Sequence, residues 1–197
     1  MRASGPNREA LSLRARKRAA AKAHVADVAI ALFAERGYTT VSVAEICAAA
    51  EIAPRSFFRY FATKEDVLVE PMRELASGVE AAVAAAPPDE PDDEVLEREL
   101  RRLAEQIVAD WDRLSVCFKV VRETPAVRAS PLLQLADCEQ ALADQLVRRR
   151  GGETPADWRT RLRVARAVAA FRVWLDELRT RAVPDPLAHL DTILAAR

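Results

Sequence analysis

Residues 42–64, SVAEICAAAEIAPRSFFRYFATK, contain the signals for two very short helices separated by a three-residue break. Ser42 suits the N-cap of the first helix, because Glu45 follows three residues later and would complete a capping box. Pro54 suits the first turn of the second helix, where a missing backbone N–H costs nothing. We therefore predict helices at 43–50 and 54–60, a helix-turn-helix pair.

A longer helix must support this pair, because isolated helices of two turns are not stable in water. One apolar stripe with helical spacing precedes it, between about Arg14 and Arg36, and Gly37 then favours a left-handed helix end. Thr63 and Asp66 predict the cap of a long helix that runs to about Ala85. The stripe consists of Val25, Val28, Ala29, Leu32 and Phe33.

The rest of the chain is also predicted to be helical. Of its 197 residues, 50% are apolar and only 5 are glycine, a composition that favours helix and suffices for a core. A polar linker is expected at Pro87–Asp93. Further helices are expected at 94–111, 114–123, 131–150, 157–182 and 185–196, so the fold class is all-α with about nine helices.

Charge is distributed unevenly along a chain whose net charge is zero. Residues 1–65 carry 11 Lys and Arg against 6 Asp and Glu, so the basic front end is suited to a polyanion such as DNA. A basic disordered tail is the alternative explanation. The three cysteines have no metal-ligand spacing, and neither a membrane span nor a secretory signal is visible, so a cytoplasmic protein is expected.

Residues 32–68 resemble the DNA-binding domain of the TetR family of transcriptional regulators. The matches are Leu32-Phe33, Gly37-Tyr38, Ser42-Val43, Ile46, Ala49-Ala50, Phe57-Phe58, Tyr60-Phe61 and Lys64-Glu65. Three positions depart from the family pattern: Glu51 replaces a usual Gly, Ala53 a usual Ser or Thr cap, and Phe58 a common Tyr. If Glu51 must adopt a positive φ, the strain is roughly 1–2 kcal/mol.

The resemblance implies double-stranded DNA as a partner. It also implies that a homodimer represses transcription by binding a palindromic operator, and that a small apolar or anionic effector releases the homodimer from the DNA. The tail at 1–13 is expected to be basic and disordered, because Gly5, Pro6 and Asn7 interrupt any helical pattern. The helix-turn-helix domain is expected at 14–63, and a helical effector-binding and dimerisation domain, which the resemblance implies, at 64–197. The homodimer would form through about 157–196. Burial within the same subunit is the alternative for the apolar stripe of the last helix, Leu187, Leu190, Ile193 and Leu194.

The candidate DNA contacts lie on and around the second short helix. Arg55 and Ser56, at its exposed start beside Pro54, are expected to read base edges, since arginine prefers guanine. The resemblance assigns phosphate contacts to Ser42, Tyr60 and Lys64, and Arg59 suits either purpose. Phe58 belongs to the same set, although it lacks the hydroxyl of the family's tyrosine. Arg14, Arg16, Lys17 and Arg18 form either a DNA-binding arm or part of a solvated tail.

The candidate effector pocket is apolar and aromatic, with one cation. Arg172 interrupts an apolar run, so it would face the cavity and pair with an anionic ligand, or else pair with Asp176 or extend to the surface. The other lining residues suit a core equally well. The full set is Trp111, Leu114, Phe118, Val121, Phe171, Arg172 and Trp174.

Other functional classes have little support in the sequence. Only two histidines occur, and no nucleotide-binding, zinc-protease or nucleophile-elbow motif is present, so neither enzymatic activity nor a cofactor or metal is expected. A helical protein-interaction module is the remaining alternative. Salt dependence separates it from a DNA-binding protein, since phosphate contacts weaken steeply with ionic strength.

Overall fold

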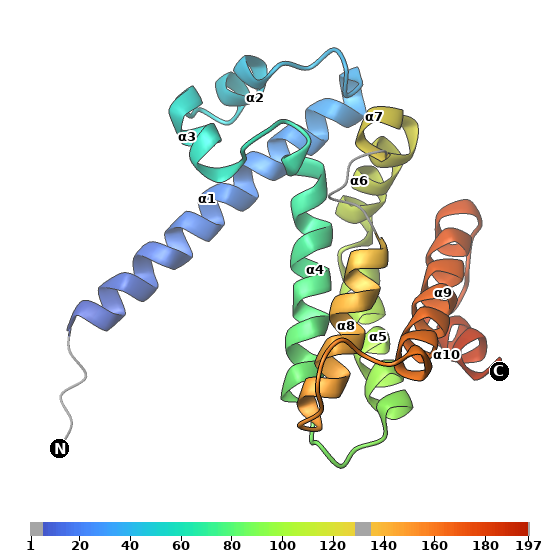
Figure 1. Ribbon diagram of the computed structural model, residues 1–197. Helices are drawn as coiled ribbons and strands as arrows, with labels where there is room; N and C mark the ends of the chain where they lie inside the picture. Colours follow the sequence, from blue (N-terminus) through green and yellow to red (C-terminus); the bar gives the residue numbers. More distant parts are fainter. Residues whose placement is uncertain (1–5, 129–134, 197) are drawn as a thin grey trace. The chain divides into compact units, whose positions relative to one another are not determined.

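The computed structural model describes residues 6–128 and 135–196, and within them it is built from helices and connecting turns, as the composition predicted (Figure 1). The helices are α1 (Pro6–Arg36), α2 (Val43–Ala49), α3 (Pro54–Tyr60), α4 (Asp66–Ala85), α5 (Asp92–Ala109), α6 (Trp111–Glu123), α7 (Pro125–Arg128), α8 (Leu135–Arg149), α9 (Trp158–Thr180) and α10 (Pro186–Ala195).

Most predicted helices are confirmed, with two differences. Helix α1 begins at Pro6 rather than near Arg14, because nothing in the local sequence stops a helix whose C-terminal half is held by packing. The four-residue α7 was not predicted. The start of the predicted helix 131–150 falls partly outside the described residues. No helix in the described ranges is long and apolar enough to cross a membrane.

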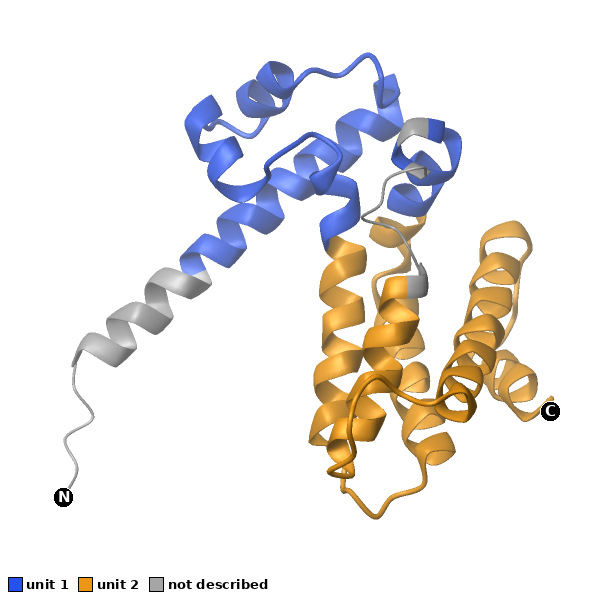
Figure 2. Ribbon diagram, in the orientation of Figure 1, with its two compact units in different colours: residues 1–70, 116–128 blue, residues 71–115, 129–197 orange. Residues whose placement is uncertain are grey.

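The chain divides into two compact units (Figure 2). Unit 1 comprises residues 1–70 and 116–128, and unit 2 comprises residues 71–115 and 129–197. A division by contacts does not test which segments fold independently, so the domain boundaries expected from the sequence stay a prediction.

The core of unit 1 forms where α2 and α3 pack with α1. Val25, Ala29 and Phe33 of α1 are at most 2% exposed, which confirms the centre of the predicted stripe. Gly37 ends α1 with a φ of +84°, the left-handed conformation that favours glycine. The predicted cap before α4 is also present: Thr63 N donates to Asp66 Oδ2 at 2.9 Å, and Asp66 N donates to Thr63 Oγ1 at 3.2 Å.

In unit 2, residues of α4, α5, α8 and α9 form a second core, and a buried ion pair holds the linker that precedes α5. Arg149, at the end of α8, places Nη2 2.6 Å from Asp92 Oδ1, and both side chains are at most 3% exposed. The same guanidinium donates to the carbonyl of Glu90 at 2.9 Å. Because an unpaired buried charge is costly, these bonds fix the linker that precedes α5.

Trp174 of α9 bonds to the start of α10. Trp174 is fully buried, its Nε1 donates to the carbonyl of Pro186 at 2.6 Å, and its ring lies 5.1 Å from that of Phe171. Leu190 is fully buried as well, whereas Ile193 is only partly buried. The α10 stripe therefore has one part buried within its own subunit and another part near the surface.

Candidate nucleic-acid interface

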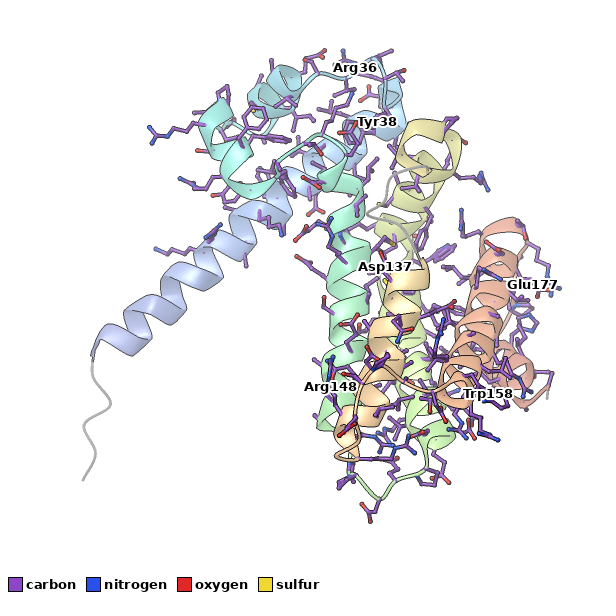
Figure 3. All side chains as sticks on the ribbon, viewed as in Figure 1. Arg36, Tyr38, Asp137, Arg148, Trp158 and Glu177 are labelled. Carbon is purple, nitrogen blue, oxygen red and sulfur yellow. The ribbon has the colours of Figure 1, made fainter. Side chains whose placement is uncertain are left out.

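The predicted capping box begins α2. Glu45 N donates to Ser42 Oγ at 3.2 Å, and Ser42 N donates back to Glu45 Oε2 at 2.8 Å. Arg36, at the end of α1, forms an ion pair with the same carboxylate, and Figure 3 shows Arg36 near the start of α2. These contacts, the Ser42 backbone N–H first, lower the pKa of Glu45 to about 2.

This geometry bears on the phosphate contact expected at Ser42. Both the backbone N–H and the hydroxyl of Ser42 already donate to the Glu45 carboxylate. A phosphate oxygen at this position would have to replace that carboxylate. The contact at Ser42 stays a prediction, and it requires Glu45 to move.

The turn between α2 and α3 shows the consequences of two departures from the family pattern. Glu51 adopts a φ of +53°, the left-handed region, with a strain cost of about 1–2 kcal/mol for a residue with a Cβ. Ala53, the N-cap of α3, provides no side-chain hydrogen bond. Because neither local signal stabilises α3, its position depends on packing.

Two phenylalanines provide that packing. Phe57 is fully buried and Phe61 is 2% exposed. The opposite face of the helix contains Arg55, Phe58 and Arg59, all exposed. Phe58 is 56% exposed, although it is a large apolar side chain. Helix α3 therefore presents two cations and one apolar ring outward, while Ser56 and Tyr60 are partly buried at the sides.

Arg59 and Tyr60 form a local pair. The Arg59 guanidinium lies 5.0 Å from the Tyr60 ring centroid, and its Nη2 donates to the Tyr60 hydroxyl at 3.0 Å. From α1, Arg18 Nη2 donates to the Arg59 carbonyl at 3.5 Å. Arg18 therefore lies beside the end of α3, whereas the side chains of Arg14 and Arg16 fall outside the described residues.

Lys64 forms a clamp that sequence reasoning missed. Its Nζ donates to the carbonyls of Tyr38 and Val41, at 2.8 and 2.9 Å, and lies 4.1 Å from the Tyr38 ring centroid. Two of its three N–H groups are therefore used within the protein. Next to it, burial and the neighbouring Glu65 carboxylate raise the pKa of Tyr38. Lys64 fixes the loop between α1 and α2, and it has one donor left for a phosphate.

Comparisons with known proteins agree with this geometry. The family model for bacterial regulatory proteins of the tetR family matches residues 25–70, the segment that holds the helix-turn-helix pair. MftR of Mycobacterium tuberculosis, named for the transcriptional regulation of mycofactocin biosynthesis, is 31% identical over 144 residues, covering 71% of this chain and 70% of that protein. The chain belongs to the TetR family.

Two further TetR-family comparisons extend over most of the chain. TcmR of Streptomyces glaucescens, an HTH-type transcriptional regulator, is 29% identical, covering 88% of this chain and 79% of that protein. The crystal structure of Thermus thermophilus FadR, a TetR-family repressor in complex with lauroyl-CoA, is 26% identical with a TM-score of 0.51, covering 88% and 91% of the two chains. TetR-family proteins are DNA-binding transcriptional regulators, and the relatives named here are regulators rather than enzymes.

The predicted effector residues of this TetR-family chain are divided between its units. Phe118 and Val121 belong to unit 1, and the others belong to unit 2. Arg172 is exposed, and Asp176, the partner suggested by its position four residues later, forms an ion pair with Arg179 at 3.4 Å. The indole N–H of Trp174 already donates a hydrogen bond to the carbonyl of Pro186. None of the predicted residues lines either pocket described in unit 2, so the effector site stays a prediction.

The capping box predicts a specific response to acid. Because the folded-state pKa of Glu45 is about 2 and its ordinary value is 4.5, its carboxylate favours folding above pH 4.5, and this contribution disappears as the pH falls from 4.5 towards 2. An NMR titration of the Glu45 carboxyl carbon should therefore show a midpoint near 2. A midpoint near 4.5 would show that the capping box does not persist in solution.

The Lys64 clamp predicts a loss of stability on truncation. Lys64→Ala leaves the carbonyls of Tyr38 and Val41 without a charged donor, so we expect the free energy of unfolding to fall by about 1–3 kcal/mol in urea titrations. Lys17→Ala, which removes an exposed lysine of α1, is the matched control and should change little. Equal stability of the two variants would contradict the clamp.

Proposed function

We propose that this chain is a homodimeric transcriptional repressor that binds a palindromic operator and is released by a small-molecule effector. The observation that carries the proposal is the outward face of α3. The inner face of this helix is fixed by Phe57 and Phe61. On its outer face, Arg55 and Arg59 are exposed one helical turn apart, within a helix-turn-helix typical of the family. This is the arrangement by which such motifs place a recognition helix in the major groove.

The DNA contacts follow from this face. Arg55, at the first turn of α3, is positioned to donate to guanine O6 and N7, with Pro54 and Ser56 beside it. Arg59, Tyr60 and the remaining donor of Lys64 supply phosphate contacts on the same side of the motif. Lys17 and Arg18 extend the cationic surface along α1, and Arg18 is already bonded to the end of α3.

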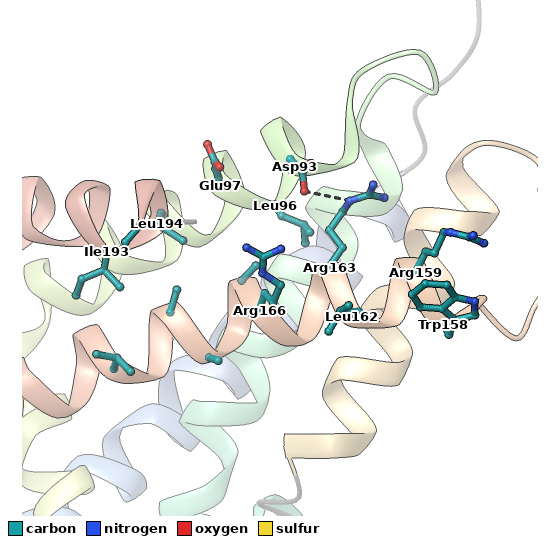
Figure 4. A pocket seen from close by; sticks show the side chains of 15 residues that line it. Asp93, Leu96, Glu97, Trp158, Arg159, Leu162, Arg163, Arg166, Ile193 and Leu194 are labelled. Carbon is teal, nitrogen blue, oxygen red and sulfur yellow. Dashed lines mark ion pairs between the residues drawn. The ribbon is translucent and has the colours of Figure 1, made fainter.

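The proposed dimer interface is the surface of α9 and α10. Trp158, Leu162 and Val173 of α9 are 63%, 53% and 48% exposed, an unusual concentration of large apolar side chains on one helix. They line a surface pocket of about 660 Å³ between α5, α9 and α10. In Figure 4, Trp158 lies at one end of this pocket, and Ile193 and Leu194 lie at the other.

Polar groups surround this apolar surface, as they do at protein interfaces. Arg163 forms an ion pair with Asp93 at 3.1 Å, and Arg159 lies over the Trp158 ring at 4.5 Å from its centroid. A second copy of the chain, docked by a two-fold axis, would cover the same patch on both subunits. This supports dimerisation through about 157–196.

The effector is proposed to be small and apolar or anionic. Thermus thermophilus FadR is described in complex with lauroyl-CoA, which is both apolar and anionic. For this chain, the candidate lining remains the aromatic and apolar set given by the sequence, including Trp111, Leu114 and Phe118. An effector relieves repression only if it binds the state that does not bind DNA more tightly than the state that does.

Selection of bound sequences from random duplex DNA tests the proposal directly. We expect an inverted repeat whose half-sites lie about 34–36 Å apart or a multiple of that distance, with guanine at a fixed position in each half. Affinity for the selected duplex should fall steeply as salt concentration rises. Failure to enrich any sequence, together with no binding in dilute buffer, would reject the proposed function.

The dimer interface predicts a separable defect. Leu162→Glu places a charge in the exposed apolar patch, so we expect the protein to remain folded but to become monomeric in sedimentation experiments. Its affinity for the full operator should fall at least tenfold, because one short helix reads only a few base pairs. Arg148→Glu changes an exposed residue at the end of α8 and is the control. A dimeric Leu162→Glu variant would place the interface elsewhere.

A further inference from the structure

Phe58 is the exception among the phenylalanines of the helix-turn-helix. Phe33, Phe57 and Phe61 are at most 2% exposed, whereas Phe58 is 56% exposed on α3. The core of unit 1 does not need this ring, and exposing it to water is unfavourable. Its position on the outward face suggests a partner that covers it.

The orientation of the Phe58 ring is already restricted. It packs edge-to-face against Phe57, with ring centroids 5.4 Å apart and an interplanar angle of 85°. Since Phe57 is fully buried, this contact ties Phe58 to a fixed point of the core. Ordering the side chain at an interface therefore costs less entropy than it would for a freely rotating group.

The residues around Phe58 indicate what the partner is. Arg55 lies three positions earlier, one helical turn away on the same face, and Arg59 is the next residue. An apolar ring between two exposed cations matches a surface that is anionic at its edges and apolar at one point. The major groove has this pattern where a thymine occurs, because the thymine C5-methyl group is an apolar feature among polar base edges.

We propose that Phe58 is a specificity-determining residue that packs on the methyl group of one thymine in each half-site, next to the base pair read by Arg55. The inference rests on the proposed function and deepens it. A phenyl ring has no hydroxyl with which to bond a phosphate or a base edge, so its only favourable contact in the groove is apolar. It therefore selects thymine over cytosine, which presents an amino group in the major groove and no methyl.

The test uses the full chain and its selected operator, with thymines replaced one position at a time by deoxyuridine, which lacks only the methyl group. Affinity is measured by fluorescence anisotropy at constant salt. At one position in each half-site, the replacement should weaken binding about fourfold, the effect expected for one buried methyl group. Replacement at other positions should change affinity less than twofold.

A double-mutant cycle assigns the methyl contact to Phe58. In Phe58→Ala, the affinity ratio between thymine and uracil at the sensitive position should fall from about four to about one. Phe58→Leu keeps an apolar side chain and should retain a ratio above two. Arg55→Ala is the matched control on the same face: it should weaken binding while leaving the ratio unchanged. Circular dichroism checks that each exposed-site variant keeps its helical content.

Three outcomes would overturn the inference while leaving the proposed function intact. These are a selected operator with no thymine in its half-sites, uniform tolerance of uracil, and an unchanged thymine-to-uracil ratio in Phe58→Ala. In the last case, a loss of affinity in Phe58→Ala would show that the ring contacts the DNA elsewhere than at a thymine methyl group. Absence of any DNA binding by the unmodified chain rejects the proposed function itself, and this inference with it.

Discussion

The structure of unit 1 depends on the burial of two side chains: Phe57, which belongs to α3, and Phe61, which directly follows it. A helix of seven residues has too few internal hydrogen bonds to offset the entropy of ordering it, and α3 lacks an N-cap side chain and follows a strained Glu51. Packing with α1 and α2 therefore determines where α3 lies and which face it turns outward. The exposure of Arg55, Phe58 and Arg59 is a consequence of that inward anchoring, so the packing that stabilises α3 also determines the face that the proposed function assigns to DNA.

Local signals predicted the elements of the fold well. Both capping boxes, at Ser42–Glu45 and Thr63–Asp66, and the left-handed Gly37 depend on residues within four positions of each other, so the sequence displays them directly. The Lys64 clamp could not be predicted in this way. It joins Lys64 to backbone carbonyls of Tyr38 and Val41, and no side-chain pattern indicates which carbonyls a lysine will reach across more than twenty residues. The contacts of Arg149 with Asp92 and Glu90 were missed for the same reason.

The family resemblance located the helix-turn-helix motif correctly, but it did not show which hydrogen-bond donors are already used within the protein. It assigned phosphate contacts to Ser42 and Lys64, but in this structure the N–H and hydroxyl of Ser42 donate to Glu45, and Lys64 uses two of its donors on carbonyls. A resemblance carries residue types, whereas the number of free donors depends on what surrounds each side chain. The same residue type at the same motif position can therefore have different numbers of donors available for DNA.

The proposed dimer interface on α9 bears on the small size of the reading helix. Seven residues of helix can reach only a few base pairs, and their contacts give limited discrimination against the many competing sites of a genome. Water-exposed Trp158, Leu162 and Val173 are unfavourable in a monomer, so covering them by a second copy would supply the free energy that holds two reading helices in one assembly. Specificity would then come from the product of two modest half-site affinities. Any ligand that changes the spacing between the two helices would reduce that product without altering a single base contact.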